Sequence, residues 1–196
     1  MIKIMKSSFI LASASPRRQQ LLRDIGLQFD VIPGDVNEDF LNDELPVDYV
    51  SRMSREKSDA IAQKVPDAWV LGADTIVIID GEVLGKPLTR EDARNMLIKL
   101  SGREHCVITG FTIVKKSAHT TMTNVVESRV VFKTIEADEL EWYIDSPEPY
   151  DKAGAYAVQG MAGYFVKEIH GSYTNVVGLP LTEVVTALKE VGAVMF

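Results

Sequence analysis

The run from Trp69 to Ile79, Trp-Val-Leu-Gly-Ala-Asp-Thr-Ile-Val-Ile-Ile, constrains the fold of this chain more than any other segment. It is rich in β-branched residues, and Asp80-Gly81 separates it from the short run Glu82-Val83-Leu84. Asp-Gly between two such runs is a strong hairpin signal, because both residues tolerate the positive φ that a tight turn requires. The sequence therefore predicts a long strand over Trp69–Ile79 that turns back into a short strand over Glu82–Leu84.

Strand and helix patterns alternate along the rest of the chain. Short strands are expected at 9–13, 28–32, 156–159 and 163–168, and two long paired strands at 105–115 and 121–134. Helices are expected at 15–26, opened by a Ser15 cap, at 47–64, at 89–102, opened by a Thr89 and Asp92 capping pair, at 137–145 and at 181–191. This alternation predicts an α/β fold with a mixed, twisted sheet and flanking helices.

Length and composition narrow the class of protein. A chain of 196 residues with 46% hydrophobic and 25% charged residues is typical of a soluble globular protein, as one large domain or two small lobes that share a cleft. The single cysteine, Cys106, excludes an internal disulfide framework and a cysteine-rich zinc site. No apolar stretch approaches the ~20 residues that span a bilayer, and the apolar run at 9–12 is too short for a signal peptide. We expect a cytoplasmic protein without a membrane partner.

The formal net charge of −7 argues against nucleic acid as a partner, since that binding depends on many Lys and Arg contacts to phosphate. A small phosphorylated ligand needs only a local group of cations. Ser13-Ala-Ser-Pro-Arg17-Arg18 supplies such a group where a predicted strand meets a predicted helix. A helix N-terminus favours anions, and arginine binds phosphate oxygens in pairs. The same residues also fit a simple helix cap followed by solvated arginines.

Three further segments carry candidate chemistry. Asp74 interrupts an apolar strand, where a buried carboxylate needs a partner, and it could bind Mg²⁺ or act as a general base. Lys86 lies between Gly85 and Pro87 and could direct its ammonium group into a cleft. Asp151-Lys152-Ala-Gly-Ala-Tyr-Ala-Val-Gln159-Gly160 combines small residues, a cation and an amide that can pair with a base edge. Each segment also fits a structural role: a strand-end aspartate, a surface lysine, or a tight turn into a strand.

Several common sites are absent from the sequence. It has no phosphate-binding Gly-x-x-x-x-Gly-Lys-Ser/Thr loop, no dinucleotide-binding glycine pattern and no serine nucleophile elbow. His105, His119 and His170 lack the spacing of metal ligands. Cys106 beside His105 is a poor dyad, because neighbours on a strand point to opposite faces. A covalent mechanism is therefore not expected.

Taken together and in their order along the chain, these and several further short segments resemble those of the Maf family. They are Ser-x-Ser-Pro-Arg-Arg, Gly-Ala-Asp-Thr, Gly-Lys-Pro, Leu-Ser-Gly-Arg, Lys-Ala-Gly-Ala-Tyr…Gln-Gly and the closing Gly171-Ser-Tyr-Thr-Asn-Val-Val-Gly-Leu-Pro, spread over about 9–188. The resemblance implies one Maf-like domain over 1–196, with an elongated two-lobed fold related to inosine triphosphate pyrophosphatases and a central cleft. It also implies a nucleoside triphosphate pyrophosphatase, and the Lys152-Ala-Gly-Ala-Tyr run is similar to the branch that uses dTTP and UTP.

The resemblance also suggests residue roles. Asp74 matches the proton acceptor, and Arg17, Thr75 and Gln159 match positions that set substrate choice. Ser13, Arg18, Glu38, Lys57 and Lys86 match residues of the phosphate and metal site, with Lys152 as a further cation. A divalent cation, Mg²⁺ or Mn²⁺, would be held by substrate phosphates with Asp74 and Glu38. Ala14, Asp151 and Ala157 stand where the family often has glycine, which is expected to alter substrate preference before activity.

Two alternatives to a dTTP and UTP pyrophosphatase are retained. One is the sister branch that acts on N7-methyl-GTP. The other is a nucleotide-binding regulator of septum formation with little catalysis, against which Asp74, Lys57 and Lys86 argue, because a pure binder needs no positioned carboxylate. A homodimer is expected only from the habit of the family.

Overall fold

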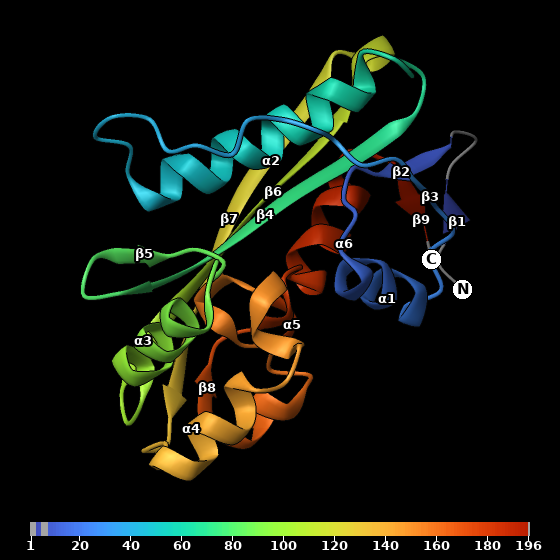
Figure 1. The fold of residues 1–196 in the computed structure, drawn as a ribbon. Coiled ribbons are helices and arrows are strands. Elements are labelled where there is room, and N and C mark those ends of the chain that lie inside the picture. The colour runs from blue at the N-terminus through green and yellow to red at the C-terminus, as the bar shows by residue number, and fades with distance from the viewer. Residues whose placement is uncertain (1–2, 5–7, 196) are drawn as a thin grey trace. The chain divides into compact units, whose positions relative to one another are not determined.

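The computed structural model describes residues 3–4 and 8–195 (Figure 1). The start of the chain, where no signal peptide is expected, lies partly outside the described residues. The chain divides into two compact units. The first consists of Met1–Asp74, Thr109–Val126 and Gly178–Phe196, and the second of Thr75–Ile108 and Glu127–Val177. A single domain over 1–196 stays a prediction.

The main sheet is mixed, as the alternating pattern predicts. Its strand order is β3-β2-β4-β6-β7-β8, and β5 pairs with β4. The bounds are β2 Phe9–Leu11, β3 Asp30–Val31, β4 Trp69–Ile79, β5 Glu82–Leu84, β6 Glu104–Lys115, β7 Thr120–Phe132 and β8 Val166–His170. Strand β2 runs parallel to both β3 and β4, whereas the β4–β5 and β7–β8 pairs are antiparallel. A separate antiparallel pair joins β1 Lys3–Ile4 to β9 Val194–Met195.

The predicted hairpin is confirmed. Asp80 and Gly81 both have positive φ, 53° and 77°, and β4 pairs with β5 from Ile79–Glu82 to Val77–Leu84. The Asp-Gly pair allows this two-residue turn because glycine and aspartate enter the left-handed region at low cost.

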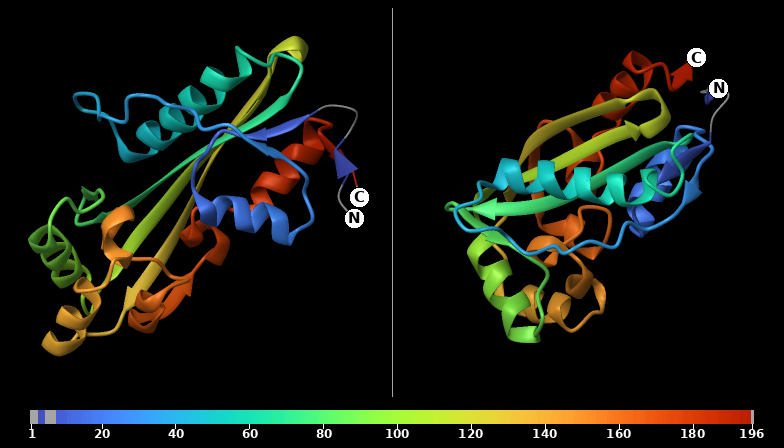
Figure 2. Two further views of the ribbon diagram at one scale, coloured as in Figure 1. Left: turned by 45° about the vertical axis from the view of Figure 1, so that its right-hand side comes forward. Right: turned by 90° about the horizontal axis from the view of Figure 1, so that it is seen from above.

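The first unit contains helices α1 Pro16–Asp24, α2 Pro46–Ala62 and α6 Leu181–Glu190. Helix α1 begins with proline at its first turn and buries Leu21 and Leu22, as expected. Ser15 occupies the N-cap position, but its side chain makes no capping hydrogen bond, so that part of the prediction is wrong. The Ser15 amide instead donates to Ser13 Oγ over 3.3 Å. Figure 2, in the view from above, shows α2 lying over the first part of β4, and both helix and strand contribute to a buried core.

The second unit contains α3 Arg90–Leu100, α4 Ala137–Ile144, α5 Tyr173–Val177 and the 3-10 helices η2 Glu148–Asp151, η3 Ala153–Ala155 and η4 Met161–Phe165. A further 3-10 helix, η1 Lys116–Ala118, belongs to the first unit and connects β6 to β7. The capping box that opens α3 is present in full: Thr89 Oγ1 accepts from the Asp92 amide, and the Asp92 carboxylate accepts from the Thr89 amide. Large apolar side chains from α3, α4 and the strands form one buried core.

Some elements differ from the expected ones. Residues 28–32 form only the two-residue strand β3, whose residues are exposed. The strand expected at 156–159 is absent, and the one expected at 163–168 begins only at Val166, because η4 precedes it. The short helix α5 and the β1–β9 pair were not predicted. No helix in the described part of the chain has both the length and the apolar character needed to cross a bilayer.

Candidate active site

Lys57 connects the two carboxylates that the sequence singled out. Its Nζ lies 2.6 Å from Asp74 Oδ1 and 2.6 Å from Glu38 Oε1. The Lys57 and Asp74 side chains are largely buried, whereas the Glu38 side chain is 52% exposed. Thus Asp74 has the charged partner that its position in an apolar strand required. The structure brings together three predicted site residues from α2, β4 and the acidic loop that precedes α2.

Glycines bring Lys57 close to Asp74. A Cβ on Gly72, two residues before Asp74, would lie 2.3 Å from the Ser54 carbonyl oxygen of α2. A Cβ on Gly34 would lie 2.5 Å from the Lys57 carbonyl oxygen. Such distances are far shorter than a normal van der Waals contact, so neither position has room for a side chain. The glycine of the Gly-Ala-Asp segment therefore serves the close packing of α2 on β4.

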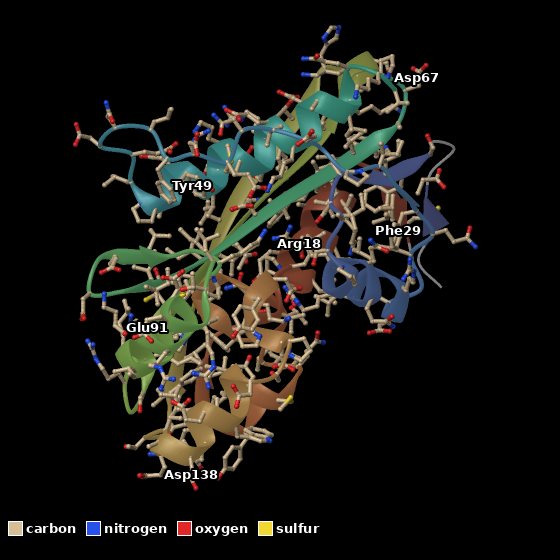
Figure 3. All side chains as sticks on the ribbon, viewed as in Figure 1. Arg18, Phe29, Tyr49, Asp67, Glu91 and Asp138 are labelled. Atoms are coloured by element: carbon tan, nitrogen blue, oxygen red, sulfur yellow. The ribbon has the colours of Figure 1, made fainter. Side chains whose placement is uncertain are left out.

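The acidic loop that carries Glu38 is tied to α2. Tyr49 Oη donates to the Glu38 carbonyl oxygen over 2.8 Å, and the Tyr49 ring stacks on Phe40 with centroids 3.7 Å apart. Arg52 donates to the Asp39 carbonyl oxygen over 2.9 Å and forms a two-pronged contact with Glu44 of 2.6 and 2.7 Å. These contacts hold the Glu38 backbone next to the helix that bears Lys57. Figure 3 labels Tyr49 on α2.

Arg18 is buried, and the contacts described for it are with the protein itself. Its Nε donates to the Gly178 carbonyl oxygen over 2.7 Å, and its Nη1 donates to the Ala73 carbonyl oxygen over 2.8 Å and to Ser13 Oγ over 3.1 Å. Figure 3 labels Arg18 on α1. The arginine thus joins three separate segments of the first unit directly beside Asp74. Its predicted contact with phosphate stays a prediction.

The charges of this group influence one another. Burial lowers the pKa of the Arg18 guanidinium from its ordinary value, and the Asp74 carboxylate acts in the opposite direction. Arg17 lowers the same pKa further, and Glu38 raises it. Two arginines, one lysine and two carboxylates therefore lie within electrostatic range, and arginine keeps its charge even when buried. Such a group can bind an anion and hold the Asp74 carboxylate in a fixed position.

The remaining predicted residues belong to the second unit. Thr75 follows Asp74 in β4, so its side chain leaves the strand on the opposite face. Lys86 and Gln159 are exposed. Lys152 Nζ donates to the Glu148 carbonyl oxygen over 2.7 Å and contacts the Asp151 carboxylate. The Gly154 amide donates to the Gly85 carbonyl oxygen over 3.0 Å, which places the Lys152 segment beside the Lys86 segment.

His105 and Cys106 do not form a catalytic dyad. His105 Nε2 lies 2.8 Å from Tyr156 Oη, whereas Cys106 Sγ contacts Glu127 Oε1 over 3.5 Å. Burial and Glu127 raise the pKa of the Cys106 thiol, which disfavours the reactive thiolate. The absence of a covalent mechanism stays a prediction.

Several residues that support the candidate site have no recognisable signal in the sequence. Tyr49 and Arg52 fix the Glu38 loop. In the sequence they look like ordinary solvent-exposed residues of a helix, so nothing there indicates this role. Glu148 lies outside every recognisable motif. The Gly178 carbonyl oxygen has no signal in the sequence at all, because any residue supplies that atom.

Known proteins are similar to this chain over nearly its whole length. A family model described as Maf-like protein matches residues 8–191. A protein named dTTP/UTP pyrophosphatase from Syntrophus aciditrophicus is 54% identical, over 98% of this chain and 94% of that protein. Proteins of the same name from Geotalea uraniireducens and Geobacter sulfurreducens are 50% and 47% identical, each over 96% of this chain and over 97% and 98% of their own lengths.

Two solved structures share the fold. The Staphylococcus aureus Ham1 protein has a TM-score of 0.56 at 14% identity, and a HAM1 protein from Coxiella burnetii has a TM-score of 0.52 at 12% identity. Each comparison covers 94% of this chain and 99% of the other. At such identities the likeness concerns the fold alone, and it confirms the predicted α/β class with a mixed sheet.

Proposed function

We propose that this chain, which belongs to the Maf family, hydrolyses dTTP and UTP to the nucleoside monophosphate and pyrophosphate. The observation that carries the proposal is the buried Lys57 ammonium group between the Asp74 and Glu38 carboxylates. The close relatives with the name dTTP/UTP pyrophosphatase support the choice of reaction and of substrate. The chemistry needs no nucleophilic side chain, because positioning and electrostatics supply most of the catalysis of phosphoryl transfer.

A divalent cation fits this carboxylate pair. Both carboxylates already approach one positive centre, the Lys57 ammonium group. Within the described residues, no group of three or more His, Cys, Asp and Glu side chains could hold a metal alone. Mg²⁺ commonly uses one or two carboxylates together with substrate phosphates, so Asp74 and Glu38 suit Mg²⁺ or Mn²⁺ that arrives with the nucleotide. The ion would offset the negative charge that develops on the phosphate oxygens.

Asp74 would act as the general base. A water molecule would attack the α-phosphorus while its proton passes to Asp74. The bond from the α-phosphorus to the oxygen that bridges the α- and β-phosphates breaks, and pyrophosphate leaves with that oxygen. Lys57 keeps Asp74 oriented through its 2.6 Å contact. Arg17 would bind phosphate oxygens. Arg18 would orient Ser13 and the Ala73 carbonyl group beside the general base, Asp74.

The second unit would select the nucleotide. Thr75 and Gln159 would contact the base, and Lys86 and Lys152 would add positive charge near the phosphates. The proposed substrate is a small molecule and not a nucleic acid, which agrees with the net charge of −7.

A cytoplasmic location and a homodimer are also part of the proposal. Neither of them is needed for the proposed chemistry.

The test is pyrophosphate release from a panel of nucleoside triphosphates with Mg²⁺ or Mn²⁺. We expect preference for dTTP and UTP, and a fall in turnover of about 10²–10⁴-fold in Asp74→Asn. The matched control is Asp80→Asn, an exposed aspartate at the end of the same strand, in a turn position that asparagine accepts. Preference for N7-methyl-GTP would keep the reaction but refute the substrate. A folded protein that binds nucleotides yet releases no pyrophosphate would point to the septum regulator.

A further inference from the structure

The carboxylate of Glu148 holds the loop that carries Gln159. Glu148 Oε2 accepts from the Met161 amide over 2.9 Å, and Oε1 accepts from the Ala162 amide over 3.2 Å. The hydroxyl group of buried Tyr143 donates to Oε1 over 3.1 Å. Hydrogen bonds to a carboxylate are stronger than those to a neutral acceptor. One side chain therefore fixes the start of η4, immediately after Gln159 and Gly160.

Gly160 provides a second, independent sign of this contact. A Cβ on Gly160 would lie 2.2 Å from Glu148 Oε2 and 2.4 Å from Oε1. The φ of Gly160 is −109°, which any residue can adopt, so space and not backbone conformation favours glycine. A carboxylate end can usually move aside, but this one is held by two amides and a tyrosine hydroxyl group. Alanine at position 160 must therefore displace the Glu148 carboxylate.

The rest of the loop is fixed, and Gln159 projects from it. The Gly160 amide donates to the Ala157 carbonyl oxygen over 3.2 Å, which closes a turn around Gln159. Ala157 is buried, whereas Gln159 is exposed. Because the turn is anchored on both sides, the Glu148 contacts fix the backbone from which the Gln159 side chain extends.

The same short helix also positions a cation. Lys152 Nζ donates to the carbonyl oxygen of Glu148 over 2.7 Å. Glu148 thus accepts from Lys152 through its backbone and from the Met161 and Ala162 amides, just after Gln159, through its side chain. Lys152 and Gln159 are both proposed substrate contacts, so one residue of η2 sets the geometry of two.

We propose that Glu148 is a positioning residue for nucleotide selection, which acts by holding the Gln159 turn and does not touch the nucleotide. The inference rests on the proposed function, because it assigns base recognition to Gln159. Removal of the carboxylate releases the turn, and Gln159 then no longer offers its donor and acceptor in a fixed direction. Selectivity for pyrimidine nucleotides is lost before the chemical step is affected, since Asp74 and Lys57 belong to the other unit.

The test compares Glu148→Gln, Gly160→Ala and Glu139→Gln with the unmodified chain. Glu139 is a matched control: its carboxylate also accepts from a backbone amide, that of Glu136 over 2.9 Å, and from a tyrosine hydroxyl group, that of Tyr164 over 2.7 Å. It lies in the same unit but contacts neither Gln159 nor its turn through these bonds. The measurements are kcat and KM for dTTP, UTP, CTP and GTP, together with the thermal unfolding midpoint of each variant.

Both loop variants should raise KM for dTTP and UTP, with kcat changed much less, and the ratio of kcat/KM for dTTP over GTP should fall about ten- to a hundred-fold. Glu139→Gln should lower stability and leave that ratio unchanged. Amide hydrogen exchange at Met161 and Ala162 should become faster in Glu148→Gln, which reports the released turn without any substrate.

Two different failures can be distinguished. If the unmodified chain prefers dTTP and UTP but Gly160→Ala or folded Glu148→Gln keeps the original ratio, the role of Glu148 is wrong and the proposed function stands. An equal fall of the ratio in Glu139→Gln overturns it as well, because general destabilisation would then explain the effect. If the unmodified chain releases no pyrophosphate from dTTP or UTP, the proposed function fails and the inference fails with it.

Discussion

His105 should make the stability of this protein sensitive to mild acid. Its side chain is only 2% exposed, and its ring packs edge-on against Phe132 and Tyr156 with centroids 4.9 and 5.4 Å away. Nε2 lies 2.8 Å from Tyr156 Oη, whereas Nδ1 is buried and has no hydrogen-bond partner among the described residues. Burial lowers the pKa of His105 from 6.5 to about 4. A proton on Nδ1 would place a charge in an apolar core without compensation.

The sign of the effect follows from the direction of this pKa shift. Below pH 6.5 the unfolded chain takes up a proton at His105, whereas the folded protein does so only near pH 4. Stability from this residue is complete above pH 6.5 and is lost as the pH falls toward 4. The difference between the two pKa values corresponds to about 3 kcal/mol in total, of which about 2 kcal/mol is already lost at pH 5.

The perturbation is His105→Gln, which removes the titration and keeps a polar group near Tyr156 Oη. Urea unfolding gives the free energy of unfolding of each protein. It is monitored by tryptophan fluorescence at several pH values between 7.5 and about 4.5. The useful quantity is the difference between the two proteins, because other titrating groups cancel. We expect this difference to shift by about 2 kcal/mol in favour of the variant between pH 7.5 and pH 5. The control is His170→Gln, since that histidine is exposed. A difference that stays constant across this range would show that His105 does not make the stability sensitive to acid.

Four other predictions concern the first unit and the α3 cap. Lys57→Met should abolish most turnover, measured as pyrophosphate release, because it leaves the Asp74 and Glu38 carboxylates adjacent without their shared cation; unchanged turnover would contradict the proposed role. Arg18→Met should lower the free energy of unfolding by about 2–4 kcal/mol in urea titrations, since it leaves the Ala73 and Gly178 carbonyl groups unpaired. Gly72→Ala should reduce both stability and turnover, measured on one sample, because its Cβ would overlap α2; a variant that loses neither would show that α2 can move away. Thr89→Ala should cost about 1 kcal/mol in the same titration through loss of the α3 capping box, and Arg90→Ala at the next position is the comparison that keeps the cap.

Local rules predicted the regular elements well. Periodicity, the Asp80-Gly81 turn and the Thr89 capping box depend on residues near one another in sequence, so the sequence contains the whole signal. The Tyr156–Gln159 strand was wrong for the opposite reason. Its extended appearance, with small and aromatic residues, is overruled by the turn that the Gly160 amide closes with the Ala157 carbonyl oxygen, and the Glu148 carboxylate of η2 caps η4 directly after this turn. No local sequence pattern predicts that contact.

The adjacent arginines Arg17 and Arg18 show why the site was only partly predictable. Neighbours on a helix point about 100° apart, so two consecutive residues cannot both face the same ligand in the same way. In α1 one guanidinium group is buried and hydrogen-bonded to backbone carbonyl groups, while Arg17 remains half-buried. The sequence identifies two adjacent arginines at a helix start and does not distinguish their roles. Arg18 differs from Arg17 because it is hydrogen-bonded to the Ala73 and Gly178 carbonyl groups, which only the fold brings there. A motif therefore predicts which residues gather around the candidate site, and tertiary hydrogen bonding decides that Arg18 binds backbone carbonyl groups there.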